Sequence, residues 1–242
     1  DDRETILKHL SERRLRGCER TFANVYLWAR FYNEGWAEIE GTAVFRTGPE
    51  GAYSYTYPIG AGDRKKVVEL LMQYAQEKGY PFQLHALSTE EMNELESYFP
   101  GKFQVTWPRD YEDYVYETEK LINLSGKKYH RKKNQINQFK EANPDWSYKT
   151  ITDSNQEEGK VVAFTLGEPV CDDTFVVHIE KAYADVRGAY PLINQQFLEN
   201  EVSGYKYVNR EDDTGEEGLR TAKLSYHPVF MVEKGIATLK GE

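Results

Sequence analysis

Apolar and polar residues alternate in short runs along the first half of the chain, and this pattern predicts strands separated by helices. Several runs are rich in Tyr, Thr, Val and Phe, which fit a half-buried pleated surface. The strands predicted here cover residues 36–46, 53–59, 82–87, 104–107 and 111–116. An earlier run, residues 21–31, mixes apolar and aromatic side chains and fits either a short helix or a strand.

Two helices are expected between these strands, and each carries recognisable end signals. Asp63 precedes a run whose apolar side chains recur at helical spacing, and Gly79 follows that run. Ser88 and Glu91, three residues apart, match a capping box that would start the second helix.

The same kinds of pattern restart after Leu124. They predict helices over residues 126–142, 189–202 and 216–223 and strands over residues 146–151, 160–167, 174–180, 205–209 and 226–232. Because both halves mix strands and helices, we expect an α/β (α+β) fold of two tandem units, each a mixed sheet flanked by helices. We place the boundary near residue 118, so that the units cover residues 1–118 and 119–242.

The composition excludes several classes of protein. Hydrophobic residues make up 39% of the 242 residues and aromatic residues 14%, which is enough for a core and excludes wholesale disorder. The net charge of −9 argues against a generally basic protein that coats nucleic acid. No apolar run approaches the ~18 residues of a membrane span. The two cysteines, Cys18 and Cys171, fit a reducing cytoplasm, where we expect the protein.

One segment is strongly basic within this acidic chain. Residues 120–140 hold seven Lys or Arg side chains and no acid. The candidate anion-binding residues among them are Lys127, Lys128, Arg131 and Lys133. On a helix, spacings of four and three place part of this set on one face. The face then either binds cofactor phosphates or the acceptor end of an RNA, or is simply a solvated helix surface.

A second candidate is the turn Arg187-Gly188-Ala189, where a strand gives way to an apolar helix. Free backbone N–H groups and the positive end of the helix dipole suit a phosphate or carboxylate there. Gly188 would let the backbone approach such an anion closely, and Arg187 adds positive charge. The alternative is a plain helix start after a loop.

A third candidate lies just past the predicted strand that ends at Asn209. Glu211 and Asp212 stand where ligands bind in open α/β sheets, at the carboxyl ends of strands. Either carboxylate would bind an amine or act as a general base, and Tyr226 would donate a proton. Alternatively, the carboxylates only cap the helix that follows.

The histidines add little to these candidates. The five histidines show no spacing typical of a metal site, so we expect no metal. His178 and Glu180 share one face of a strand by period 2 and form either an acid–base pair or satisfied polar residues of the core.

Three runs of sequence resemble a known family. They are LSGKKYHRKKNQINQFKEANPDW, VVAFTLGEPVCDDTFVVHIEKAYADVRGAYPLINQQF and NREDDTGEEGLRTAKLSYHPV. They look like the phosphatidylglycerol lysyltransferase C-terminal-domain family, and specifically its stand-alone, uncharacterised bacterial members. The resemblance implies two tandem units similar in fold to the Gcn5-related N-acetyltransferases. The joint at residues 153–160 is shorter than the resemblance leads us to expect.

The resemblance also implies an activity. The expected reaction moves an acyl or aminoacyl group from an activated donor, aminoacyl-tRNA or acetyl-CoA, to an amine or hydroxyl of a small molecule or headgroup. Arg187, Gly188 and Ala189 then fall where an acetyltransferase binds the donor pyrophosphate, and the basic helix would hold more distant phosphates. Two other functions fit the same fold: a non-catalytic binding module and an acetyl-CoA-dependent N-acetyltransferase.

Overall fold

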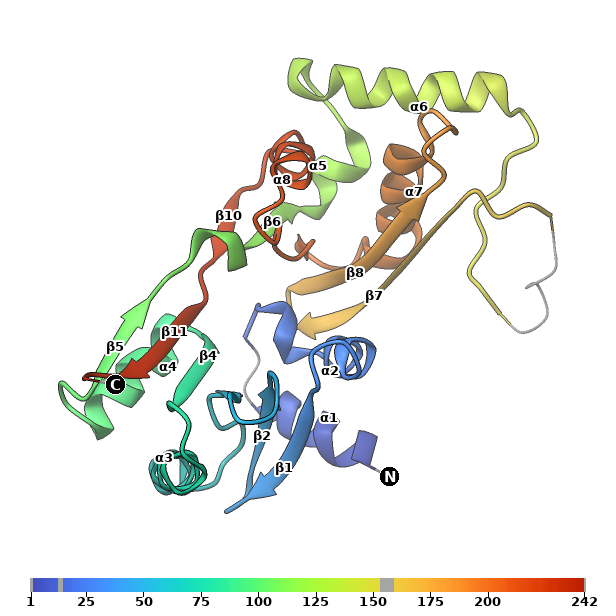
Figure 1. The fold of residues 1–242 in the computed structure, drawn as a ribbon. Helices are drawn as coiled ribbons and strands as arrows, with labels where there is room; N and C mark the ends of the chain where they lie inside the picture. Colours follow the sequence, from blue (N-terminus) through green and yellow to red (C-terminus); the bar gives the residue numbers. More distant parts are fainter. Residues whose placement is uncertain (1, 13–14, 153–158, 242) are drawn as a thin grey trace.

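The computed structural model of the chain describes residues 2–12, 15–152 and 159–241. It has two mixed β-sheets, each flanked by helices, so the expected fold class is confirmed (Figure 1). Most of the short joint expected at residues 153–160 lies outside the described residues. Among the helices that are described, none combines the length and apolar character needed to cross a bilayer.

The first sheet has the strand order β1-β2-β3-β4-β11-β5. Its strands are β1 (Gly35–Ile39), β2 (Thr42–Thr47), β3 (Ser54–Thr56), β4 (Gln83–Leu87), β5 (Phe103–Thr106) and β11 (Gly235–Leu239). Only the β3–β4 pair is parallel. The helices of this part are α1 (Asp2–Glu12), α2 (Phe22–Trp28), α3 (Arg64–Lys78) and α4 (Thr89–Tyr98), with a 3₁₀ turn η1 (Cys18–Arg20).

The second sheet has the strand order β10-β6-β9-β8-β7. Its strands are β6 (Asp113–Glu117), β7 (Ala163–Cys171), β8 (Thr174–Ala182), β9 (Tyr207–Asn209) and β10 (Phe230–Val232). Only β8 and β9 run parallel. The remaining helical elements are η2 (Arg109–Tyr111), α5 (Thr118–Asn123), η3 (Lys127–Tyr129), α6 (His130–Ala142), α7 (Ala189–Phe197), η4 (Leu198–Val202) and α8 (Glu217–Leu224).

The predicted end signals of α3 and α4 are confirmed. Asp63 accepts a hydrogen bond from the Lys66 amide at 3.0 Å, and Gly79 adopts the left-handed conformation that ends α3. Ser88 and Glu91 form the reciprocal capping box at the start of α4. The ambiguous run at residues 21–31 contains the short helix α2.

Other predicted elements differ from the structure. The single strand expected over residues 36–46 is the hairpin β1–β2, whose turn places Glu40 and Gly41 at positive φ. Residues 146–151 form no strand: Trp146 and Tyr148 instead pack against the core of the second sheet without sheet partners. The last predicted strand, residues 226–232, is β10 and begins later, at Phe230.

The sheets also do not follow the expected boundary at residue 118. Strand β6 precedes that boundary but pairs with β9 and β10 in the second sheet. Strand β11, which the sequence pattern did not predict, returns to the first sheet and lies between β4 and β5 (Figure 1). The two connections that cross between the sheets therefore run side by side near Asp113 and Lys234.

Candidate functional site

The second sheet opens between β8 and the segment that follows β9. Strand β9 pairs with β8 only at residues 174–176, while β8 continues to Ala182 with β7 as its sheet partner. The chain beyond β9 stays bonded to β6, because the Arg210 amide donates to the Tyr114 carbonyl. Side chains of β8 and of residues 210–213 therefore face each other across the opening.

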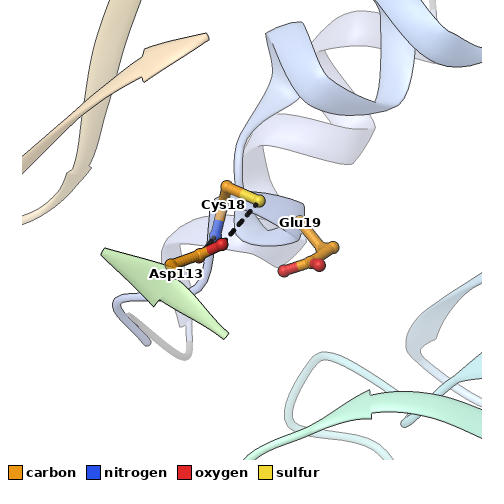
Figure 2. A group of neighbouring side chains, drawn as sticks. All are labelled: Cys18, Glu19 and Asp113. Carbon is orange, nitrogen blue, oxygen red and sulfur yellow. Dashed lines mark hydrogen bonds between the residues drawn. The ribbon is translucent and has the colours of Figure 1, made fainter. Parts of the chain in front are cut away.

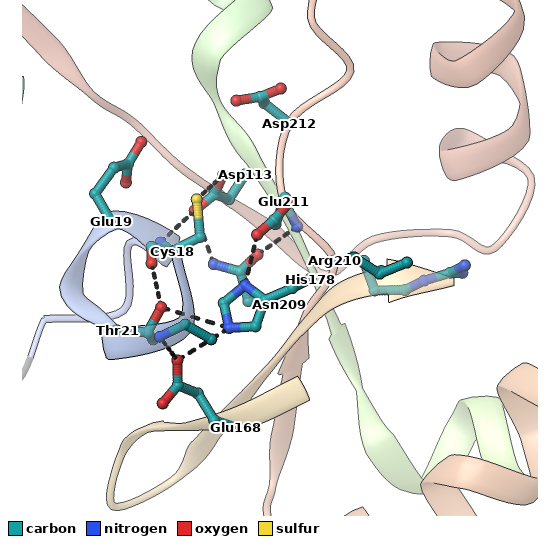
Figure 3. A network of polar contacts seen from close by, with 12 residues as sticks. Cys18, Glu19, Thr21, Asp113, Glu168, His178, Asn209, Arg210, Glu211 and Asp212 are labelled. Carbon is teal, nitrogen blue, oxygen red and sulfur yellow. Dashed lines mark hydrogen bonds and ion pairs between the residues drawn. The ribbon is translucent and has the colours of Figure 1, made fainter. Parts of the chain in front are cut away.

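His178 bridges this opening (Figure 3). Its Nδ1 lies 2.8 Å from Glu211 Oε1, and its Nε2 lies 3.2 Å from Glu168 Oε1. Burial opposes the charged imidazole, but the two carboxylates outweigh it and raise the pKa of His178 to about 9. His178 is therefore a cation near neutral pH and serves to hold Glu211 in place.

Glu168 ties the same network to the first half of the chain. Its Oε1 accepts a hydrogen bond from the Ala23 amide in the first turn of α2. Thr21 Oγ1, at the start of α2, lies 3.4 Å from His178 Nε2 (Figure 3). The opening of the second sheet is thus closed on one side by the start of α2.

A buried lysine stands at the crossing between the sheets. The side chain of Lys234 is 4% exposed, and its Nζ donates to Asp113 Oδ1 at 2.6 Å and to Glu19 Oε1 at 2.7 Å. Its Nζ also lies 3.3 Å from Cys18 Sγ and 3.9 Å from Asp212 Oδ2. Asp113 further accepts from the Cys18 amide and from Asn209 Nδ2.

Cys18, Glu19 and Asp113 are the types of side chain that bind a metal, and their ligand atoms lie within 4.8 Å of one another (Figure 2). The Lys234 ammonium contacts all three groups and so fills the place that a cation would take. Burial, and then Asp113, raise the pKa of the Cys18 thiol well above its usual value, so the thiol is a poor nucleophile.

Asp212 is the partly exposed acid next to this cluster. Burial, followed by the Asp113 and Glu19 carboxylates, outweighs the attraction of Lys234 and raises the pKa of Asp212 to about 6. Glu34, which precedes β1, also lies near Glu19, and burial raises its pKa to about 7. These carboxylates suit a primary amine, and Asp212 can take up a proton near neutral pH.

Cations gather on the other side of Glu211. The side chain of Arg210 is 12% exposed and donates through Nη2 to Glu180 Oε1 at 2.8 Å, while its Nη1 has no partner among the described residues. The Arg210 guanidinium lies 4.8 Å from the Tyr226 ring centroid, and Lys132 Nζ lies 3.9 Å from the same centroid. Burial, and then Arg210, lower the pKa of Lys132 to about 8.

The structure gives the predicted acidic residues and the tyrosine different surroundings. Glu211 and Asp212 flank the opening of the second sheet. Tyr226 is 5% exposed, and burial raises its pKa to about 12, so its hydroxyl stays protonated. His178 pairs with Glu211, and Glu180 pairs with Arg210. Of the two alternatives for His178 and Glu180, the structure therefore favours polar residues satisfied by other partners.

The predicted anion-binding residues fall into two groups. Lys127, Lys128, Arg131 and Lys133 are exposed on η3 and α6. Arg187 is exposed, whereas Gly188 and Ala189 are buried where α7 starts. A Cβ on Gly188 would lie 2.3 Å from the Gln135 carbonyl oxygen of α6. Gly188 is thus required for the packing of α6 against α7, and its role toward an anion stays a prediction.

The packing of Gly188 predicts a large effect on stability. Its φ of 86° is in the left-handed region, and the Gln135 carbonyl is backbone that cannot easily move away. We expect Gly188→Ala to lower the free energy of unfolding by about 1–3 kcal/mol through backbone strain alone, with the close contact adding to it. Urea denaturation would measure this loss. Gly218→Ala in α8, where a Cβ has open space, should be neutral or stabilising.

Comparison with known proteins places this arrangement in a family. The sequence model described as "Phosphatidylglycerol lysyltransferase, C-terminal" matches residues 11–158 and 155–237. The chain belongs to this family. No curated protein matches the chain in sequence.

Solved structures agree with the family assignment. A conserved protein of unknown function from Bacteroides thetaiotaomicron is 33% identical, with a TM-score of 0.88 over 99% of this chain and 97% of that one. The structure of L-PGS from Bacillus licheniformis is 14% identical, with a TM-score of 0.63 over 92% and 93%. The C-terminal domain of a candidate lysylphosphatidylglycerol synthetase from Agrobacterium fabrum is 12% identical, with a TM-score of 0.68 over 100% and 93%. These last two likenesses show that members of the family share the fold.

Proposed function

We propose that this family member is an acyltransferase of the aminoacyl-transferring branch, taking its acyl group from an aminoacyl-tRNA. The main support for the proposal is that a group of carboxylates and a group of cations lie on opposite sides of Glu211. Carboxylates that suit an amino group lie on one side, at Glu34 and Asp212, and the cations Arg210 and Lys132 lie on the other. An aminoacyl-tRNA has a group that matches each region. Its amino group is positively charged, and the phosphates of its terminal nucleotide are negatively charged.

The proposed step is the attack of an acceptor amine or hydroxyl on the ester carbonyl of the donor. A bond forms between the acceptor atom and the acyl carbon, and the bond from that carbon to the ribose oxygen breaks. Asp212 takes the proton of the acceptor, and the ribose oxygen leaves as a hydroxyl after it is protonated. Tyr226 is our candidate for that proton donor. Positioning and charge supply the rest of the rate enhancement.

The surface of η3 and α6 is the proposed place for the remaining nucleic-acid phosphates. Lys127, Lys128, Arg131 and Lys133 are exposed there and carry no acid between them. The start of α7 fits a donor pyrophosphate less well. The Ala189 amide already donates to the Val186 carbonyl, and Pro191 has no N–H to offer. This favours aminoacyl-tRNA over acetyl-CoA as the donor.

Charge reversal on α6 tests the choice of donor. We expect Lys127→Glu/Arg131→Glu to abolish binding of aminoacyl-tRNA at moderate salt, because each lost phosphate contact also removes counterion release. Fluorescence anisotropy with labelled aminoacyl-tRNA would measure it. The control, Arg30→Glu/Lys65→Glu, changes the net charge equally at exposed positions elsewhere.

Thermal shift with a panel of donors separates the rival functions. Stabilisation by aminoacyl-tRNA that the Lys127→Glu/Arg131→Glu variant loses supports the proposal. Stabilisation by CoA and acetyl-CoA alone would instead identify an acetyl-CoA-dependent N-acetyltransferase. If no donor stabilises the protein, the chain is a non-catalytic binding module on the same fold.

A further inference from the structure

A cavity of about 540 Å³ lies in the first half of the chain, between the β1–β2 hairpin and α3. This volume is within the range of small-molecule sites. Its walls are mainly apolar and include Trp36, Ile39, Val44, Leu71 and Tyr74. None of the charged residues described around Glu211 lines it. The cavity is therefore separate from the proposed transfer site.

Two apolar side chains that line this cavity are exposed to solvent. Leu70 and Tyr74, on the face of α3 that lines it, are 39% and 40% exposed although their neighbours Val67 and Val68 are fully buried. The Tyr74 ring of α3 offers a flat surface to a ligand ring, whereas the Trp36 side chain packs on the opposite face of the sheet against α1, with its Nε1 donating to Asp2 Oδ2 at 3.4 Å.

One charged side chain of the lining, Arg46, is held in a fixed position. Arg46 is the sheet partner of Gly35, and a Cβ on Gly35 would lie 3.3 Å from Arg46 Nε. A larger residue at this position would crowd the Arg46 side chain where it lies across β1. On its other side the guanidinium stacks 4.3 Å from the centroid of the Tyr53 ring. Arg46 makes no ion pair with any residue in the described part of the chain.

Two side chains of charged type line the cavity, Arg46 from β2 and Glu77 from α3. Glu77 Oε1 accepts a hydrogen bond from Gln73 Nε2 at 2.8 Å, one turn away on the same helix. Lys78 adds a second cation near the rim, with its Nζ 5.6 Å from the Tyr74 ring centroid. The guanidinium of Arg46 is thus the preorganised group that a ligand would meet, and a carboxylate is its best partner.

We propose that this cavity is a binding site for a small aromatic carboxylate. The ring of the ligand packs against Leu70 and Tyr74 of α3, and its carboxylate pairs with Arg46. The site does not depend on the proposed transfer reaction, because no residue of that reaction lines the cavity.

Calorimetry with three ligands of equal shape tests the site: naphthylacetate, naphthylethanol and naphthylethylamine. We expect the carboxylate to bind most tightly. Arg46→Gln should weaken its binding by about tenfold, as loss of a charged hydrogen bond does, and leave the alcohol within about twofold. Ala37→Trp, which fills the cavity from an exposed position of its wall, should abolish binding of all three.

The control variant is Arg30→Gln, an exposed arginine that does not line the cavity, and it should bind as the unmodified chain does. NMR of the methyl groups of Ile39, Val44 and Leu71 would locate the ligand. The proposal is overturned if the carboxylate does not bind, if the amine binds as tightly, or if Ala37→Trp binds it unchanged. These results are independent of any measurement with an acyl donor.

Discussion

Lys234→Met is expected to lower the free energy of unfolding by about 3–5 kcal/mol, because it removes one partner of a buried ion pair and leaves the other charged. Asp113 is fully buried, and the Lys234 ammonium is its cation at 2.6 Å. The methionine keeps the length of the side chain, so the loss reports the charge and not a cavity. Urea denaturation followed by circular dichroism would measure it.

A matched surface pair separates this effect from a general loss of charge. Lys66 forms an ion pair with Glu40 at 2.8 Å in which both side chains are about half exposed. Lys66→Met should therefore cost far less stability than Lys234→Met, because solvent screens an exposed pair. Adding Asp113→Asn to Lys234→Met should recover part of the stability, because no buried charge then remains unpaired at Asp113. Equal losses for Lys234→Met and Lys66→Met would contradict the account of the buried cluster.

Asp212→Asn is expected to reduce transfer of the aminoacyl group by about 10²–10⁴-fold, the range over which a general base acts. In the unmodified chain the rate should rise as the pH increases through about 6, because the raised pKa of Asp212 leaves the carboxyl protonated and inactive below that value. The asparagine variant should lose this dependence on pH. Initial rates with labelled aminoacyl-tRNA would give both quantities.

The control for this variant is Asp63→Asn. Asp63 caps α3, and asparagine caps a helix equally well, so neither stability nor rate should change. Binding of the donor, measured by anisotropy, should fall far less than the rate in the Asp212 variant, because the phosphates bound by η3 and α6 supply most of the affinity. A full rate in the Asp212 variant would remove its role as a base and leave the assignment of the donor to be judged on its own.

The features that the sequence predicts well are those set by neighbouring residues. Asp63, Gly79 and the Ser88–Glu91 pair lie at helix ends, and each acts within one turn of the chain. The polar loop after Asn209 is predictable from the sequence because it follows the end of a strand. By contrast, residues 146–151 alternate as a strand does, but Trp146 packs on the core without a sheet partner.

The features that the sequence misses depend on distant contacts. Lys234 lies in a polar stretch of sequence that is typical of an exposed loop. Its burial depends on contacts with Cys18, Glu19 and Asp113, which are distant from it in the sequence. The sequence does not single out Lys132 among its neighbours on α6, because helical spacing alone does not say which lysine faces Tyr226. For the same reason the partners of His178 could not be read from period 2 along β8.

The position of β11 in the first sheet affects folding of the protein during translation. Among the described strands, β5 pairs only with β11, and β11 is the last strand of the chain. During translation, more than half of the chain is synthesised between β5 and β11. Strand β5 therefore has no sheet partner during that time. Loop closure over so many residues slows folding. The first half is therefore expected to need protection from aggregation until β11 has been translated, and a fragment cut at the midpoint would keep that exposed edge permanently.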